Sequence, residues 1–130
     1  MNVNVEMSIG EFFDKITILE IKECNIKDAG KLANVKKELG YLNGLLSELP
    51  FSRDQVEKEV NDLREINEKI WDIEDNIRLK ELSKSFDAEF IELARSVYFS
   101  NDKRAEIKRD INLKLESDFV EEKSYEEYTS

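Results

Sequence analysis

A basic stretch near the end of the chain holds the residue types best suited to bind an anion. The sequence FSNDKRAEIKRD, residues 99–110, places four cationic side chains within seven positions, although the protein's formal net charge is −10. On a helix, steps of three and four residues bring Asn101, Arg104 and Lys108 onto one strip, which is apolar before and after them. Arginine offers a fork of donors for phosphate or carboxylate, and lysine offers a point charge.

Two interpretations of this strip follow from the cost of burying an unpaired charge. In the first, the cations belong to a structural ion-pair network or a solvated face, and Glu74 and Asp75 of the third predicted helix are the candidate acids. In the second, the strip lines an anion-accepting notch, with arginine and lysine as donors and with aromatic and amide groups that orient the ligand. The predicted ligand-binding residues are Trp71, Glu74, Asp75, Arg95, Tyr98, Asn101, Arg104 and Lys108.

Two acidic pairs indicate a catalytic alternative. Glu20 and Glu23 have ExxE spacing on the first predicted helix, and Asp72 and Asp75 have the same spacing on the third, so two helices could present carboxylates to Mg²⁺ or Mn²⁺. This arrangement resembles the all-helical nucleotide pyrophosphohydrolases, although the ExxD usual in the third helix of that family is absent. In the simpler interpretation, these carboxylates are ordinary charged groups on helix surfaces, and the protein has no metal site and no cofactor. The sequence leaves open whether the protein is an enzyme.

The composition restricts the chemistry and the partners. The chain has no His, so catalysis would depend on carboxylates, Lys, Tyr or a carboxylate-bound metal. Cys24 is the only cysteine, which excludes an intramolecular disulfide, and we expect it to be buried on a helix. The negative charge makes nucleic acid a poor candidate partner. We find neither a membrane-spanning apolar run nor a secretory signal, and therefore expect a cytoplasmic protein.

Helical periodicity and helix-start signals divide the chain into four helices. Hydrophobic residues make up 40% of the chain and charged residues 38%, a mixture typical of amphipathic helices. Ser8 precedes Glu11 by three residues and Ser52 precedes Gln55 by three, the spacing of a capping box. The second helix carries leucine and valine at spacings of three and four, a coiled-coil-like seam. We predict helices over residues 9–27, 32–49, 53–82 and 88–115, after a short extended N-terminal segment.

Short turns between these helices favour up-down connection of neighbours. The predicted fold is an all-α antiparallel four-helix bundle whose long third and fourth helices project beyond the compact part. Residues 1–116 form a single domain in this prediction, and residues 117–130 form an acidic tail whose flexibility the sequence leaves open. The second and third helices carry more apolar surface than one small bundle needs, so we expect a homodimer.

Five motifs together resemble a family of small, uncharacterised bacterial and phage proteins. They are SIGEFFDKITILEIK, KLANVKKEL, WDIED, FIELARSVYFSNDKRAEIKRDIN and EEKSY, which cover most of the chain. In that family the domain also occurs near or fused to enzymes of cell-surface polysaccharide synthesis, so the resemblance implies a sugar-nucleotide or sugar-phosphate context. The family's polar motif positions coincide here with Asp14, Lys15, Glu20, Lys22, Asn34, Glu38, Glu74, Asp75, Arg95, Tyr98, Asn101, Asp102, Arg104 and Lys108.

Three functional hypotheses remain at this point. The leading one is a non-enzymatic helical binding or assembly module that recognises a phosphorylated or sugar-nucleotide ligand. The second is a metal-dependent nucleotide pyrophosphohydrolase of the all-α type. The third is a purely structural module for protein-protein interaction.

Overall fold

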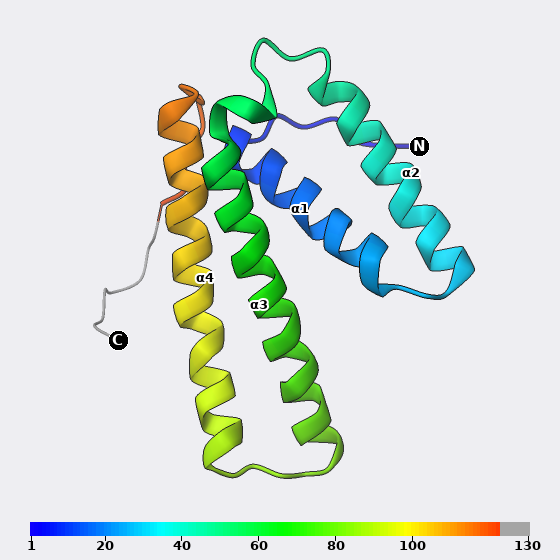
Figure 1. Ribbon diagram of the computed structural model, residues 1–130, viewed down its shortest axis with the longest axis vertical. Coiled ribbons are helices and arrows are strands. Elements are labelled where there is room, and N and C mark those ends of the chain that lie inside the picture. The colour runs from blue at the N-terminus through cyan, green and yellow to red at the C-terminus, as the bar shows by residue number, and fades with distance from the viewer. Residues whose placement is uncertain (123–130) are drawn as a thin grey trace.

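The computed structural model describes residues 1–122 and shows an all-α fold, as predicted (Figure 1). No strand occurs in this range, and residues 1–7 form an exposed segment without regular secondary structure. The predicted EEKSY motif lies partly outside the described residues. The elements are α1 (Ile9–Asn25), α2 (Ala29–Leu46), the short 3-10 helix η1 (Arg53–Val56), α3 (Glu57–Leu82) and α4 (Ala88–Lys114).

Side-chain caps set the helix starts, because the first backbone N–H groups of a helix have no partner within it. The hydroxyl of Ser8 accepts from the N–H of Glu11 at 3.0 Å, and Asp87 accepts from Phe90 at 2.9 Å. Asp28 caps α2 by accepting from the N–H of Lys31 at 2.9 Å. The second helix therefore begins three residues earlier than predicted.

Helix α1 is the centre of the fold and packs against α2, α3 and α4. Helices α3 and α4 form a long antiparallel hairpin, and α1 and α2 cover only one half of its length (Figure 1). Helix α2 packs chiefly on α1, so the arrangement is more open than a regular four-helix bundle. The core forms where α1 meets the hairpin, and its fully buried side chains include Phe13, Ile16, Val56, Leu63 and Ile111.

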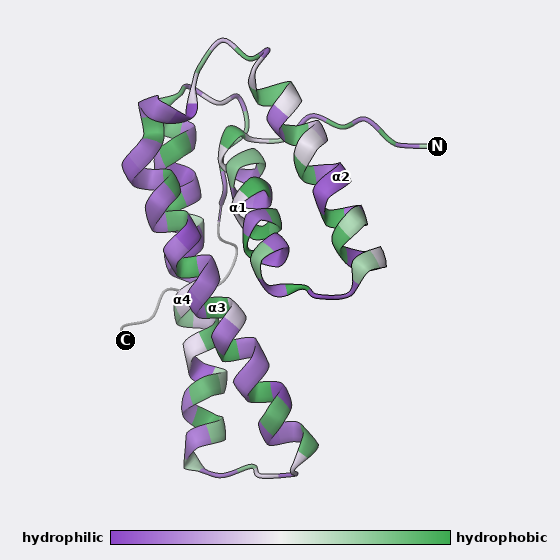
Figure 2. Ribbon diagram, turned by 45° about the vertical axis from the view of Figure 1, so that its right-hand side comes forward, coloured by the Kyte–Doolittle hydropathy of each residue, from purple (hydrophilic) through white to green (hydrophobic). Residues whose placement is uncertain are grey.

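The far half of the α3–α4 hairpin extends beyond the other helices and includes hydrophobic residues (Figure 2). Leu79, Leu82, Phe86 and Ile91 are all more than half exposed. Among the described residues, no helix combines the length and the hydropathy that crossing a membrane requires.

The chain turns back after α4 instead of leaving the domain. Glu116 adopts a left-handed backbone conformation, with φ of 57°, which reverses the chain direction. Ser117 then donates its N–H to the carbonyl of Asn112 at 2.8 Å, and its hydroxyl accepts from the N–H of Ile9 at 3.1 Å. The first part of the acidic tail therefore packs against the start of α1.

Candidate functional site

A pocket of about 290 Å³ lies between α1, α3 and α4. Its lining combines apolar residues of α1 and α3 with charged residues from all three helices. The lining residues are Ile18, Ile21 and Lys22 of α1, Asn67, Ile70, Trp71, Glu74, Asp75 and Arg78 of α3, and Arg104 of α4.

Positive charge exceeds negative charge in this pocket, in contrast to the chain as a whole. Arg78 and Glu74 neutralise each other, because Nη1 of the arginine lies 3.1 Å from Oε2 of the glutamate. The remaining charged groups are Lys22, Arg104 and Asp75. Cations in a concave site beside an apolar wall suit an anion that carries a ring or carbon skeleton.

The structure places four of the eight predicted ligand-binding residues in the pocket lining. These four are Trp71, Glu74, Asp75 and Arg104. On α3, Asn67, Trp71, Glu74 and Arg78 all lie in this lining, because residues three and four apart share one helix face.

The other four predicted residues, all on α4, do not line the pocket. Arg95 donates to Oε1 of Glu92 at 2.9 Å, and its guanidinium lies 5.7 Å from the centre of the Phe99 ring. The Tyr98 ring packs against that same phenylalanine, with centroids 4.7 Å apart. Asn101 is half-buried, and Lys108 belongs to a separate buried network.

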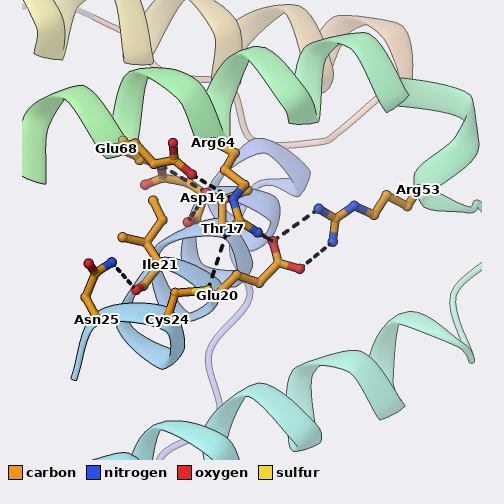
Figure 3. A network of polar contacts seen from close by, with 10 residues as sticks. Asp14, Thr17, Glu20, Ile21, Cys24, Asn25, Arg53, Arg64 and Glu68 are labelled. Atoms are coloured by element: carbon orange, nitrogen blue, oxygen red, sulfur yellow. Dashed lines mark hydrogen bonds and ion pairs between the residues drawn. The ribbon is translucent and has the colours of Figure 1, made fainter. Parts of the chain in front are cut away.

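A buried polar cluster lies directly behind the pocket. Asp14 is only 4% exposed, and its Oδ1 accepts from Nδ2 of Asn67 at 2.8 Å. The same amide donates to the hydroxyl of Thr17 at 3.0 Å, while this hydroxyl donates to the carbonyl of Asp14 at 2.8 Å. Figure 3 shows Asp14 and Thr17 on the face of α1 that meets α3. Since Asn67 also lines the pocket, the cluster fixes part of the pocket wall.

Lys108 pairs with acids other than those predicted. Its Nζ lies 2.5 Å from Oε2 of Glu11, 3.7 Å from Oε1 of Glu121 and 3.9 Å from Oδ2 of Asp14. Glu74 and Asp75, the candidate acids of the ion-pair interpretation, are therefore not the partners that the structure gives Lys108. Its carboxylate partners come from α1 and from the segment after α4.

The close approach of α4 to the start of α1 explains this pairing. A Cβ atom at Gly10 would lie only 2.4 Å from the carbonyl oxygen of Lys108, so only glycine allows the two backbones to meet here. The N–H of Gly10 donates to Oδ1 of Asn112 at 2.6 Å. The contact brings the Lys108 side chain over the first turns of α1.

Burial raises the pKa of Asp14 above its ordinary value of 3.8. The hydrogen bond from Asn67 and the positive charges of Arg104 and Lys108 lower the pKa, and the negative charge of Glu11 raises it, but burial has the largest effect. The charge of Arg104 thus acts on Asp14 from the pocket side.

The raised pKa of Asp14 predicts a defined pH dependence of stability. The Asp14 carboxyl binds its proton more tightly in the folded protein than in the unfolded chain. The contribution of Asp14 to the free energy of unfolding is therefore fully present below pH 3.8, and it is lost as pH rises through the higher pKa of the folded state. Wild type is expected to lose free energy of unfolding relative to Asp14→Asn as pH rises from about 4 to 7. Urea denaturation of both proteins across this range measures the difference, and a difference that stays constant with pH contradicts the prediction.

The acidic pairs of the metal alternative do not form a common site. Both carboxylate oxygens of Glu20 accept from Arg53, at 3.0 and 3.1 Å, and Oε1 lies 3.5 Å from Nη1 of Arg64 (Figure 3). Glu23 and Asp72 are exposed. Within residues 1–122, no three His, Cys, Asp or Glu side chains are grouped so as to hold a metal ion. The proposed use of Mg²⁺ or Mn²⁺ remains a prediction without geometric support.

Sequence reasoning missed residues of both buried polar networks, the one around Asp14 and the one around Lys108. Asp14 was not among the predicted ligand-binding residues, although its spacing from Gly10 and Thr17 places it on a buried helix face. Asn112 and Glu121 gave no local signal, because both act through residues far away in the sequence. Cys24 was expected to be buried but is exposed, 3.8 Å from Nη2 of Arg64 (Figure 3).

The comparisons with known proteins identify the family but assign no activity. Residues 3–130 match the model of a family described as "Family of unknown function (DUF6165)". Neither the curated proteins nor the solved structures gave a match to the chain. The match spans almost the whole chain, and the protein therefore belongs to the DUF6165 family.

Proposed function

We propose that this protein is a helical binding module whose pocket between α1, α3 and α4 takes a small phosphorylated ligand. The observation that carries the proposal is the local excess of positive charge, at Lys22 and Arg104, in a chain with a net charge of −10. A guanidinium in a partly desolvated site forms strong charge-assisted hydrogen bonds with phosphate oxygens. Arg104 is the principal phosphate donor in this proposal.

The lining also suits the carbon skeleton of a sugar phosphate. Trp71 offers a flat apolar surface for a sugar ring, and the carboxylates of Glu74 and Asp75 offer acceptors for hydroxyl groups. A volume of about 290 Å³ is at the lower end of the range for ligand pockets. A sugar phosphate fits this size, whereas the nucleotide part of a nucleotide sugar would extend outside the pocket.

A thermal-shift panel of sugar phosphates, nucleotide sugars and nucleotides, with and without Mn²⁺, tests the proposal. A ligand that binds the pocket raises the unfolding midpoint of wild type. Arg104→Ala is expected to weaken binding by about 10- to 100-fold, the loss of a hydrogen bond to a charged group. Arg95→Ala is the matched control, because it removes the same charge outside the pocket lining and is expected to leave affinity unchanged. Equal weakening by both variants contradicts the proposal.

The two alternative functions give different outcomes in the same panel. A pyrophosphohydrolase would require Mn²⁺ or Mg²⁺ and would lose turnover in Asp75→Asn, while a binding module has no turnover to lose. A purely structural module would show no ligand-dependent shift. The geometry favours neither alternative, since the described carboxylates do not group around a metal position and the pocket combines cations with an aromatic wall.

Self-association also remains a proposal. The exposed apolar residues on the far half of the α3–α4 hairpin, Leu79, Leu82, Phe86 and Ile91, support it, because a second hairpin of the same kind would cover them. A monomer mass in sedimentation at micromolar concentration would contradict it.

A further inference from the structure

The segment after α4, residues 115–122, brings a carboxylate into a ring of buried donors at the start of α1. Ser8 donates its hydroxyl to Oε1 of Glu121 at 2.8 Å, and Nδ2 of Asn112 donates to Oε2. Nζ of Lys108 lies 3.7 Å from Oε1. The three donor residues are well shielded from water, with exposures of 6% for Ser8, 0% for Asn112 and 11% for the Lys108 side chain.

The three donors are held in place by contacts that do not involve Glu121. Ser8 caps α1 by accepting from the N–H of Glu11, and Asn112 accepts from the N–H of Gly10 through its Oδ1. Lys108 is held by the carboxylate of Glu11 at 2.5 Å. The donors therefore keep their positions when the carboxylate between them leaves, and a preorganised site binds an anion at low entropic cost.

The segment that supplies the carboxylate is held by few contacts. Residues 117–122 form neither helix nor strand. Beyond Ser117, the segment is held at its outer side by Arg109, which donates to the carbonyl of Glu121 at 2.9 Å and pairs with Glu122 at 2.7 Å. The side chains of Arg109 and Glu122 are exposed, and exposed ion pairs contribute little stability. The carboxylate can thus leave its donors without disrupting a helix.

We propose that Ser8, Lys108 and Asn112 form a second anion site, which the side chain of Glu121 fills in the free protein and which a carboxylate or phosphate group from solution fills when that side chain is removed or withdrawn. A hydroxyl, an amide and an ammonium group are suitable donors for either oxyanion. Glu121 acts as an internal competitor that keeps this site closed in the free protein. This gives a role to the first residue of the EEKSY motif, and it does not depend on the function proposed for the pocket.

The experiment compares three full-length proteins: wild type, Glu121→Ala and Glu122→Ala. Their unfolding midpoints are measured in sodium acetate, sodium phosphate and sodium chloride at equal ionic strength. Glu121→Ala is expected to gain several degrees in acetate or phosphate relative to chloride, because the added oxyanion fills the opened site. Wild type and Glu122→Ala are expected to gain no more than about one degree. A larger gain in phosphate than in acetate identifies phosphate as the preferred chemistry, and the reverse identifies a carboxylate.

Equal responses of all three proteins to acetate, phosphate and chloride would overturn the proposal. If Glu121→Ala does not fold, Glu121→Ser serves in its place, since it also removes the carboxylate and leaves the space between the donors open. The double variant Lys108→Met/Glu121→Ala shows whether the anion binds at this site. Its unfolding midpoint is expected to rise less in acetate or phosphate than that of Glu121→Ala, because it lacks the ammonium donor.

Discussion

Lys108→Met is expected to lower the free energy of unfolding by about 3 kcal/mol, the lower end of the range for breaking a buried ion pair. The lysine lies among three carboxylates, and the variant leaves Asp14 buried without its nearby ammonium group. Two features limit the loss. The Glu11 side chain is 46% exposed, so water can solvate it, and Asp14 can bind a proton more readily than an ordinary aspartate because burial raises its pKa. Urea denaturation at neutral pH measures the effect.

Lys103→Met is the matched control for this prediction. It removes the same charge from the same helix, at an exposed position where Nζ lies 3.8 Å from Oε2 of Glu106. Pairs of this kind contribute roughly 0–1 kcal/mol. Equal losses for Lys103→Met and Lys108→Met would show that the network around Lys108 does not stabilise the fold.

Gly10→Ala is expected to cost about 1–3 kcal/mol or more, because the added methyl group has no space. The new Cβ would lie 2.4 Å from a backbone carbonyl oxygen of α4, and backbone atoms cannot move aside as the end of a side chain can. Relief of the clash would require α1 and α4 to separate, which would also lengthen the hydrogen bond from Gly10 to Asn112. The unfolding midpoint in urea measures the loss.

Gly40→Ala is the control, and it is expected to raise the free energy of unfolding instead of lowering it. No heavy atom lies within 4 Å of a Cβ built at Gly40, which is exposed on α2. At a solvent-exposed position in the middle of a helix, alanine stabilises the folded protein by roughly 0.5–1 kcal/mol relative to glycine. A stabilising Gly10→Ala variant would contradict the close packing of α1 on α4.

Features that depend on neighbours in the sequence could be predicted, because short-range interactions determine them. The cap at Ser8 was predicted from residue type and spacing, and the structure confirms it. Trp71, Glu74 and Asp75 were predicted as ligand-binding residues of one helix, and the structure places all three in the pocket lining. Of the polar strip predicted on the fourth helix, Arg104 lies in the pocket lining, whereas Asn101 and Lys108 do not.

Features that depend on how the helices cross could not be predicted. The sequence shows that Lys108 requires an acidic partner, but turn lengths do not determine whether α1 or α3 supplies it. Gly10 appears in the sequence only as a weak helix former, and its role depends on the α4 backbone beside it. Asp14 is buried because α1 is covered by α3 and α4 together, and Glu121 reaches its donors only because the chain reverses at Glu116.

The most direct test of the proposed pocket uses the chain's only tryptophan, Trp71, which lines it. Tryptophan fluorescence therefore reports on this pocket without interference from other tryptophans. On titration with glucose 1-phosphate, wild type and Arg95→Ala are expected to show a saturable change, and Arg104→Ala is expected to require at least about tenfold more ligand. No saturable change with any sugar phosphate, or the same titration curve for Arg104→Ala, would contradict the binding function proposed for this pocket.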